Sequence, residues 1–174
     1  MVVASDLVGC RYRLVQRRAH PEMPRTHASI ARAERHAAAV EAVMEMFPRK
    51  GSGRFRRIDL EGDEWERSMR TLEALASGYT HITNAVFATE EWMVRVDLLL
   101  REGDKYTPII VSNHRVARKN DTKTTPAVPT HRLGLSEPLE VPYKLRHHAV
   151  DGYRLAFAAR ALRDLGLDSG RGGA

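Results

Sequence analysis

The chain has 174 residues, of which 43% are hydrophobic and 29% charged, an ordinary composition for one globular domain with a real core. No window approaches 18 uninterrupted apolar residues, so no membrane span is expected. The first ten residues lack a basic stretch before an apolar one, so no signal peptide is expected. A single cysteine excludes an internal disulfide framework and predicts a reducing, cytoplasmic location.

The net charge of +6 is unevenly distributed along the chain. Residues 1–57 hold 12 Lys/Arg and 5 Asp/Glu, residues 58–104 hold 4 and 11, and residues 105–174 hold 12 and 6. Basic flanks around an acidic centre suit a protein that binds a polyanion at its edges and cations near its middle. Arg-rich helices that are merely solvated would give the same counts.

Residues 1–50 are predicted to form two helices. The first is expected from a cap at Ser5 and Asp6 to about residue 18, ahead of two Pro-containing pairs. The second, rich in alanine, is expected from about residue 26 to residue 47, where a proline follows.

Residues 54–116 are predicted to form the sheet core with one helix. A helix capped by Asp63 is expected to end at Gly78, and strands are expected near 80–88, 92–101 and 106–116.

The remaining chain is predicted to contain one more helix. Residues 117–142 are expected to be loop, 143–166 the C-terminal helix, and 167–174 a flexible tail. Together the elements predict a single α/β domain, with a small mixed sheet flanked by helices.

Asp97 is the first candidate site residue, because it is the one carboxylate inside the apolar run from Trp92 to Leu100. An unpaired buried carboxylate would cost several kcal/mol, so a metal ion or an Arg partner is expected beside it. An exposed strand face is the remaining alternative. His36 lies among alanines on the second predicted helix, where it is either a metal ligand or an ordinary surface or packing residue.

The order of several motifs resembles the RecB-like PD-(D/E)XK nuclease superfamily. The opening segment 4–14 with Cys10, then His36, the segments 71–78 and 82–86, and finally Asp97 follow the order of that superfamily over most of the chain. Among its members, the chain is similar to the CRISPR-associated RecB-type and AddB-type iron–sulfur exonucleases. The resemblance implies a restriction-endonuclease-like core in which His36 and Asp97 hold Mg²⁺ or Mn²⁺.

The chain departs from the superfamily's pattern after Asp97. Where the resemblance implies a Glu-x-Lys motif, Ile110 and Ser112 stand in one register and Val111 and Asn113 in the next. Neither register supplies the second carboxylate of a hard-cation site or the lysine that stabilises charge in the transition state.

Nearby residues are candidate substitutes for the missing motif. Asn113 could act as an oxygen ligand, His114 as a base and Arg115 as a phosphate clamp. The Gln-x-x-x-Tyr pattern of the last helix would fall at residues 154–158, which keep neither residue, while Asp151 and Tyr153 lie one turn earlier.

Two further features bear on ligands. In the iron–sulfur members, an N-terminal cysteine joins three C-terminal ones around a cluster. Cys10 is therefore either a buried apolar residue or a cluster ligand in a longer chain. Basic side chains are the candidate contacts to DNA phosphates, with a plain solvated surface as the alternative; they are Arg11, Arg13, Arg17, Arg18, Arg115, Arg118 and Lys119.

Three functions remain open at this point. The resemblance favours a DNA-binding RecB-family homologue with impaired or absent metal-dependent phosphodiesterase activity, acting in DNA repair or recombination with a repair-protein partner. The second is an active Mg²⁺ or Mn²⁺ nuclease whose ligands have migrated to His36, Asp97 and either Asn113 or His114. The third is a protein-interaction domain that binds neither DNA nor metal.

Overall fold

The computed structural model describes residues 1–24 and 26–174, without the side chains of Arg11 and Arg13. Its helices and strands, in chain order, are η1 (Ala4–Leu7), α1 (Arg11–Ala19), α2 (His27–Glu45), β1 (Arg57–Asp59), α3 (Glu64–Ala76), β2 (His81–Ala88), β3 (Met93–Glu102), β4 (Lys105–Ile109), β5 (Ala117–Lys119), β6 (Thr125–Ala127), η2 (Thr130–Arg132), β7 (Leu139–Val141), β8 (Tyr143–Leu145) and α4 (Ala149–Asp164).

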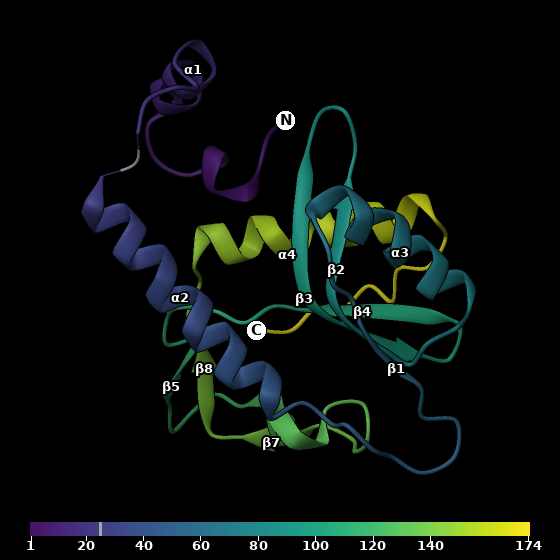
Figure 1. Cartoon of the computed structure of the whole chain (residues 1–174). Coiled ribbons are helices and arrows are strands. Elements are labelled where there is room, and N and C mark those ends of the chain that lie inside the picture. Colours follow the sequence, from purple (N-terminus) through teal and green to yellow (C-terminus); the bar gives the residue numbers. More distant parts are fainter. Residues whose placement is uncertain (25) are drawn as a thin grey trace.

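The main sheet has the strand order β1-β2-β3-β4, and α3 and α4 cover its opposite faces (Figure 1). β1 runs parallel to β2, which the intervening α3 makes possible, while β2, β3 and β4 form an antiparallel meander. The protein is therefore a mixed α/β fold in which a small mixed sheet is flanked by helices, as the sequence predicted.

The core lies between the sheet and the two covering helices. β2 and β3 are buried on both faces, so their sequences read as nearly continuous apolar runs. Ile82, Val96 and Leu99 from the strands pack with Leu75 of α3 and Leu162 of α4 in one cluster. Asp97 lies on β3, within this buried sheet.

The N-terminal segment differs from the single helix that was expected. It forms η1 and α1 with an interruption at residues 8–10, where Gly9 has a φ of 88° and Cys10 takes the extended N-cap conformation of α1. Ahead of η1, Val2 pairs with β3 through the backbone of Glu91 and Met93. α2 has no fully buried residue and packs on the sheet through its C-terminal half, with Val40 and Val43.

The tail at residues 167–174, predicted to be flexible, pairs with β4 in the structure. Tyr106 and Ile110 donate their backbone N–H groups to the carbonyls of Leu167 and Gly173, and Gly173 donates back to Pro108. The tail pairs in parallel with β4, because that strand otherwise leaves one edge of backbone groups unpaired.

Two boundaries after β4 also differ from prediction. The strand expected at 106–116 ends at Ile109, because the Asp97 carboxylate accepts the N–H of Val111 and takes the chain out of the β3–β4 ladder. The helix expected at 143–166 begins at Ala149, because residues 143–145 form β8 and pair with β5. The loop expected at 117–142 contains three short strands and η2.

Among the described residues, no helix combines the length and apolarity required to cross a lipid bilayer.

His81 at the start of β2 gives the fold a pH dependence. The side chain is buried, with Nε2 3.0 Å from the carbonyl oxygen of Leu133. Burial lowers the pKa of His81 below its ordinary value of 6.5, against an opposing hydrogen bond to Leu133, and the charge of Arg57 lowers it further.

We expect the protein to lose stability as the pH falls through and below the ordinary pKa of histidine. The unfolded chain binds the His81 proton more tightly, so the stability from neutral His81 is complete above that value and is lost toward the lower folded-state pKa. Thermal unfolding followed between about pH 7.5 and pH 5 should show this loss, and His81→Gln should flatten it. An equally steep loss in that variant would contradict the assignment.

Candidate functional site

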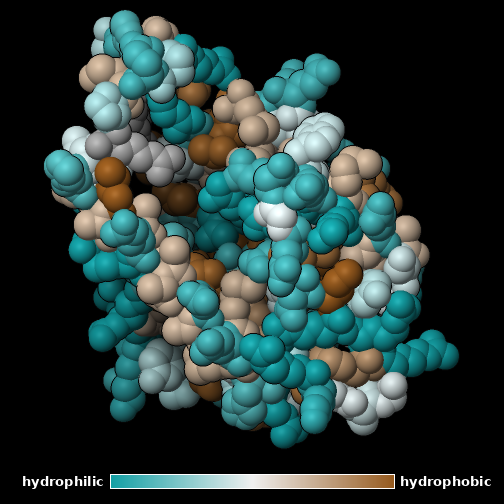
Figure 2. All heavy atoms as spheres, in the orientation of Figure 1, coloured by the Kyte–Doolittle hydropathy of each residue, from teal (hydrophilic) through white to brown (hydrophobic). Residues whose placement is uncertain are grey.

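A cleft of about 1200 Å³ opens between α2, α3, the sheet and the start of α4. The surface is hollowed beside α2, between that helix and the body of the molecule (Figure 2). All four residues that the sequence nominated as catalytic line this cleft, namely His36, Asp97, Asn113 and His114. The fold thus brings together side chains from α2, β3 and the segment after β4, and their catalytic role stays a prediction.

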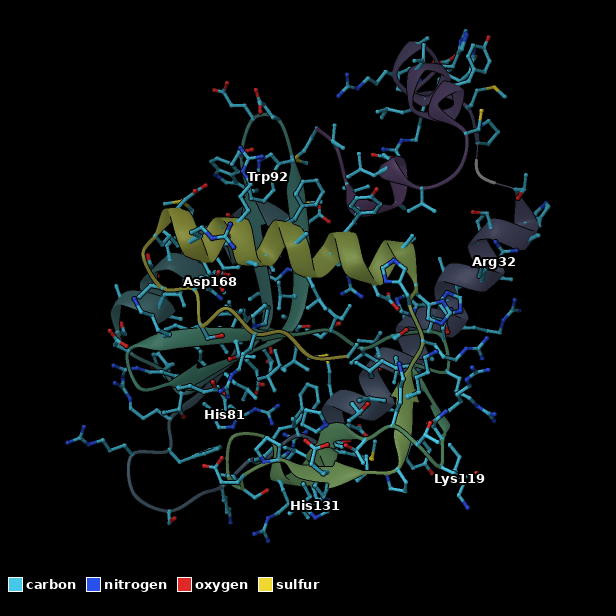
Figure 3. All side chains as sticks on the ribbon, turned by 180° about the vertical axis from the view of Figure 1, so that it is seen from behind. Arg32, His81, Trp92, Lys119, His131 and Asp168 are labelled. Atoms are coloured by element: carbon cyan, nitrogen blue, oxygen red, sulfur yellow. The ribbon has the colours of Figure 1, made fainter. Side chains whose placement is uncertain are left out.

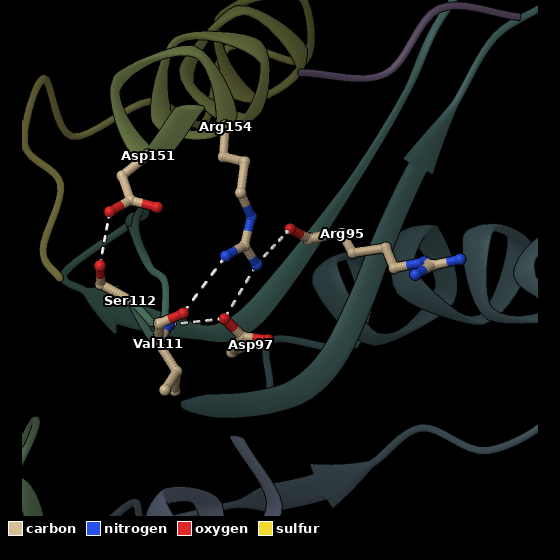
Figure 4. A network of polar contacts seen from close by, with 6 residues as sticks. All are labelled: Arg95, Asp97, Val111, Ser112, Asp151 and Arg154. Carbon is tan, nitrogen blue, oxygen red and sulfur yellow. Dashed lines mark hydrogen bonds and ion pairs between the residues drawn. The ribbon is translucent and has the colours of Figure 1, made fainter. Parts of the chain in front are cut away.

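Asp97 sits in the middle of β3, with only 12% of its side chain exposed. Its Oδ2 accepts the N–H of Val111 at 2.6 Å and the Nη2 group of Arg154 at 2.9 Å. The same guanidinium donates to the carbonyls of Val111 and Arg95 (Figure 4). The carboxylate is therefore paired with an internal cation, which removes most of the cost of burying it.

Arg154 comes from α4, at the place where the superfamily resemblance would put the Gln of the last helix. Its side chain is 16% exposed, and both its terminal nitrogens are engaged with Asp97 or with backbone carbonyls. Of the alternatives for Asp97, the structure contains the Arg partner. A metal ion bound to the same Oδ2 would meet the positive charge of Arg154.

The segment after β4 supplies backbone groups to this network and no acidic side chain. Ile110 is 1% exposed and Val111 is 9% exposed. Val111 contributes its N–H to Asp97 and its carbonyl to Arg154. Where the resemblance implies a Glu-x-Lys motif, the backbone of Val111 therefore holds the ion pair.

His36 lines the cleft from α2, and its Nδ1 is buried without a hydrogen-bond partner. In the part of the chain that the structure describes, no group of three or more His, Cys, Asp or Glu side chains is arranged to hold a metal ion. The binding of Mg²⁺ or Mn²⁺ by His36 and Asp97 stays a prediction.

The start of α4 carries a second set of polar contacts at the cleft. Asp151 accepts a 2.5 Å hydrogen bond from the hydroxyl of Ser112. The ring of His114 stacks on that of His148 with centroids 4.3 Å apart. Of the two suggested substitutes for the Gln/Tyr motif, Asp151 lines the cleft, while Tyr153 is 42% exposed.

Asp59, at the end of β1, is a further carboxylate of the cleft. Its Oδ1 accepts a 2.6 Å hydrogen bond from Thr83 and forms a 2.7 Å ion pair with Arg57. Burial acts to raise the pKa of Asp59, but the hydrogen bonds from Arg57 and Thr83 and the charges of Arg57 and Arg49 lower it overall. Asp59 is therefore held in its charged form by neighbouring donors.

The predicted DNA contacts fall into two groups. In the first, Arg17 pairs with Asp6 and Arg18 is exposed, whereas the side chains of Arg11 and Arg13 lie outside the part that the structure describes. The second group consists of Arg115, Arg118 and Lys119. It lies just beyond the cleft, because His114 lines the cleft and the chain continues from there through Arg115 into β5.

The second group belongs to a two-stranded ribbon formed by β5 and β8. Arg118 stands directly opposite Lys144, and the N–H of Arg146 extends the pairing to Val116. Because side chains alternate along a strand, Arg118, Lys144 and Arg146 share one face, and Lys119 lies on the other face with Tyr143 opposite it. Lys119 projects from the edge of the molecule (Figure 3).

We call Arg115, Arg118, Lys119, Lys144 and Arg146 the basic ribbon. Among the described residues, none of the five forms an ion pair. Like charges placed directly opposite on a ribbon repel each other, and a bound anion would relieve that repulsion.

Cys10 is exposed at the N-cap of α1. Its interpretation as a buried apolar residue is therefore wrong, because the chain turns outward at residues 8–10 before α1 begins. Its role as a cluster ligand in a longer chain stays a prediction.

Sequence reasoning missed several residues of the cleft, among them Asp59, and identified the role of Arg154 only in general terms. Arg67 of α3 and Asn84 of β2 line the cleft, and nothing in the local sequence singled them out. Arg154 carried a signal, since it falls where the resemblance would place a Gln and an Arg partner for Asp97 was among the alternatives.

Comparison of the chain with protein-family models, with curated proteins and with solved structures finds no match. The geometry of the cleft and of the basic ribbon is therefore the basis for assigning a function.

Proposed function

We propose that the chain is a RecB-like homologue with the PD-(D/E)XK nuclease fold. It binds DNA through phosphates and does not cut it by the usual metal-dependent mechanism. Its role is that of an accessory in DNA repair or recombination. The observation that carries the proposal is the ion pair between Asp97 and Arg154. The guanidinium of Arg154 neutralises the negative charge of Asp97, which a bound metal ion would otherwise neutralise.

The order of elements around the cleft supports the proposed fold. His36 lies on α2, Asp97 on β3, the following strand is β4, and α4 closes the cleft with Arg154. This is the order in which the resemblance places its metal-binding histidine, its aspartate, its Glu-x-Lys strand and its last helix. The apolar Ile110 and Val111 support the loss of cleavage, because they offer no carboxylate beside Asp97.

The basic ribbon supports the proposed partner. Its side chains form no ion pair within the described residues, and along the chain it begins directly after His114, which lines the cleft. Phosphate contacts of this kind fix a protein on nucleic acid without reading sequence.

Salt dependence of binding tests the proposed partner. Affinity for short duplex and single-stranded DNA should fall steeply as salt rises, with a log–log slope of roughly −0.9 per phosphate contact on duplex DNA. Fluorescence anisotropy between about 50 and 200 mM salt measures it. Binding that ignores salt would contradict phosphate recognition, and no binding to either form would favour the protein-interaction domain.

An active nuclease is the second candidate, and one observation favours it. His36, Asp97, Asn113 and His114 line the same cleft, although α2, β3 and the segment after β4 deliver them separately. For a metal to bind at the Oδ2 of Asp97, Arg154 would have to leave that atom. Incubation of labelled DNA with the purified chain and Mn²⁺ separates the two candidates, because only an active nuclease would cut it.

A further inference from the structure

Two buried nitrogens of the cleft have no hydrogen-bond partner among the described residues. Nε of Arg67 and Nδ1 of His36 are both shielded from solvent and make no hydrogen bond within the described residues. The remaining nitrogens of Arg67 take part in no hydrogen bond or ion pair either among those residues. A buried N–H group without an acceptor costs on the order of 1–3 kcal/mol, so the Nε group of the half-buried Arg67 calls for a ligand.

Half of the carboxylates that line the cleft are already engaged with other side chains. Asp59 is bound by Arg57 and Thr83, Asp97 by Arg154, and Asp151 by Ser112. Glu41, Glu45 and Glu61 also line the cleft, but they are exposed and solvated, and none accepts a hydrogen bond from Arg67. Arg67 is thus left as a cation that the fold itself does not satisfy.

Asn84, which also lines the cleft, has an unusual backbone conformation. It lies within β2, yet its φ is 56°, in the left-handed region that glycine, and asparagine less often, adopts outside regular strands. The register pairs Thr83 with Leu98 and Ala85 with Val96, so Asn84 stands opposite Asp97. Strain of this kind in the middle of a strand is concentrated at ligand sites.

We propose that Arg67, with His36 and Asn84, binds a phosphate group in this cleft. Guanidinium groups match the oxygens of a phosphate in both charge and geometry, whereas a metal cation would be repelled by Arg67. The choice of phosphate rests on the proposed function, since DNA supplies it as a backbone diester or as a terminal monoester. The site lies on α2, α3 and β2 and is separate from the basic ribbon.

Thermal unfolding of Arg67→Met tests the site directly. Arg70→Met is the matched control, because Arg70 lies on the same helix, is exposed and does not line the cleft. In phosphate-free buffer, Arg67→Met should be at least as stable as the parent, since it removes a buried N–H group that has no acceptor. Inorganic phosphate at matched ionic strength should raise the Tm of the parent and of Arg70→Met but not that of Arg67→Met.

DNA binding identifies the source of the phosphate. Arg67→Met should weaken binding of hexathymidylate by about tenfold more than Arg70→Met does. Loss confined to 5′-phosphorylated hexathymidylate means a terminal phosphate, and equal loss for the 5′-hydroxyl form means a backbone phosphate; both support the site.

The proposal is overturned if Arg67→Met is less stable than the parent without phosphate, or if it responds to phosphate as the parent does. Failure of the parent to bind DNA would count against the proposed function alone. The Tm response to inorganic phosphate would still report on the cleft.

Discussion

Replacing Arg154 with Met is expected to lower the free energy of unfolding by about 3 kcal/mol, because it leaves the carboxylate of Asp97 buried without a counter-ion. For a domain of this size the loss corresponds to a fall in Tm of roughly 6–12 °C. Both side chains are largely buried, at 16% and 12% exposure, so solvent screens the pair weakly.

A double-mutant cycle with Asp97→Asn separates the ion pair from the packing of Arg154. In the Arg154→Met background, Asp97→Asn should restore part of the lost stability, because it removes the orphaned charge. Arg163→Met is the control on the same helix, since Arg163 is 72% exposed in its pair with Asp168 and should contribute about 0–1 kcal/mol. Additive effects of Asp97→Asn and Arg154→Met would contradict the proposed neutralisation of Asp97.

Removing three charges from the basic ribbon is expected to weaken DNA binding by about 100-fold at moderate salt. The variant combines Arg118→Gln, Lys144→Gln and Arg146→Gln, the three side chains that share one face of the ribbon. The log–log salt slope on duplex DNA should become shallower by roughly 2.7, at about 0.9 for each lost contact.

A matched triple variant controls for net charge. Arg70→Gln, Arg163→Gln and Arg171→Gln remove the same charge from exposed positions of α3, α4 and the C-terminal segment. This control should keep most of its affinity. If it lost as much affinity as the ribbon variant, attraction by the overall charge would explain binding, and the ribbon would have no special role.

The sheet core was predictable because burial on both faces makes β2 and β3 read as apolar runs, and Asp97 interrupts one of them. The end of β4 was not predictable from local sequence, because it depends on the side chain of Asp97, which lies 14 positions earlier and accepts the N–H of Val111. The paired tail was missed for a related reason. The Gly and Ser residues of the C-terminal segment have low strand propensity, so local sequence did not predict that the segment would pair. It is ordered by pairing with the free edge of β4.

Sequence predicted which residues line the cleft in part, but it did not predict the contacts between their side chains. His36, Asp97, Asn113 and His114 were nominated from motif order, and the fold places all four on one cleft. The partner of Asp97 depended on how α4 crosses β3, which local sequence patterns do not specify. Arg67 depended likewise on which faces of α2 and α3 enclose the cleft.

The fate of DNA incubated with the purified chain and Mn²⁺ tests the central claim most directly. We predict that labelled single-stranded and duplex DNA will be bound and recovered at full length, with the same result for Asp97→Ala. Cleavage that requires Mn²⁺ and disappears in Asp97→Ala would contradict the account, because it would show that a metal displaces Arg154 and that the cleft is a working nuclease site.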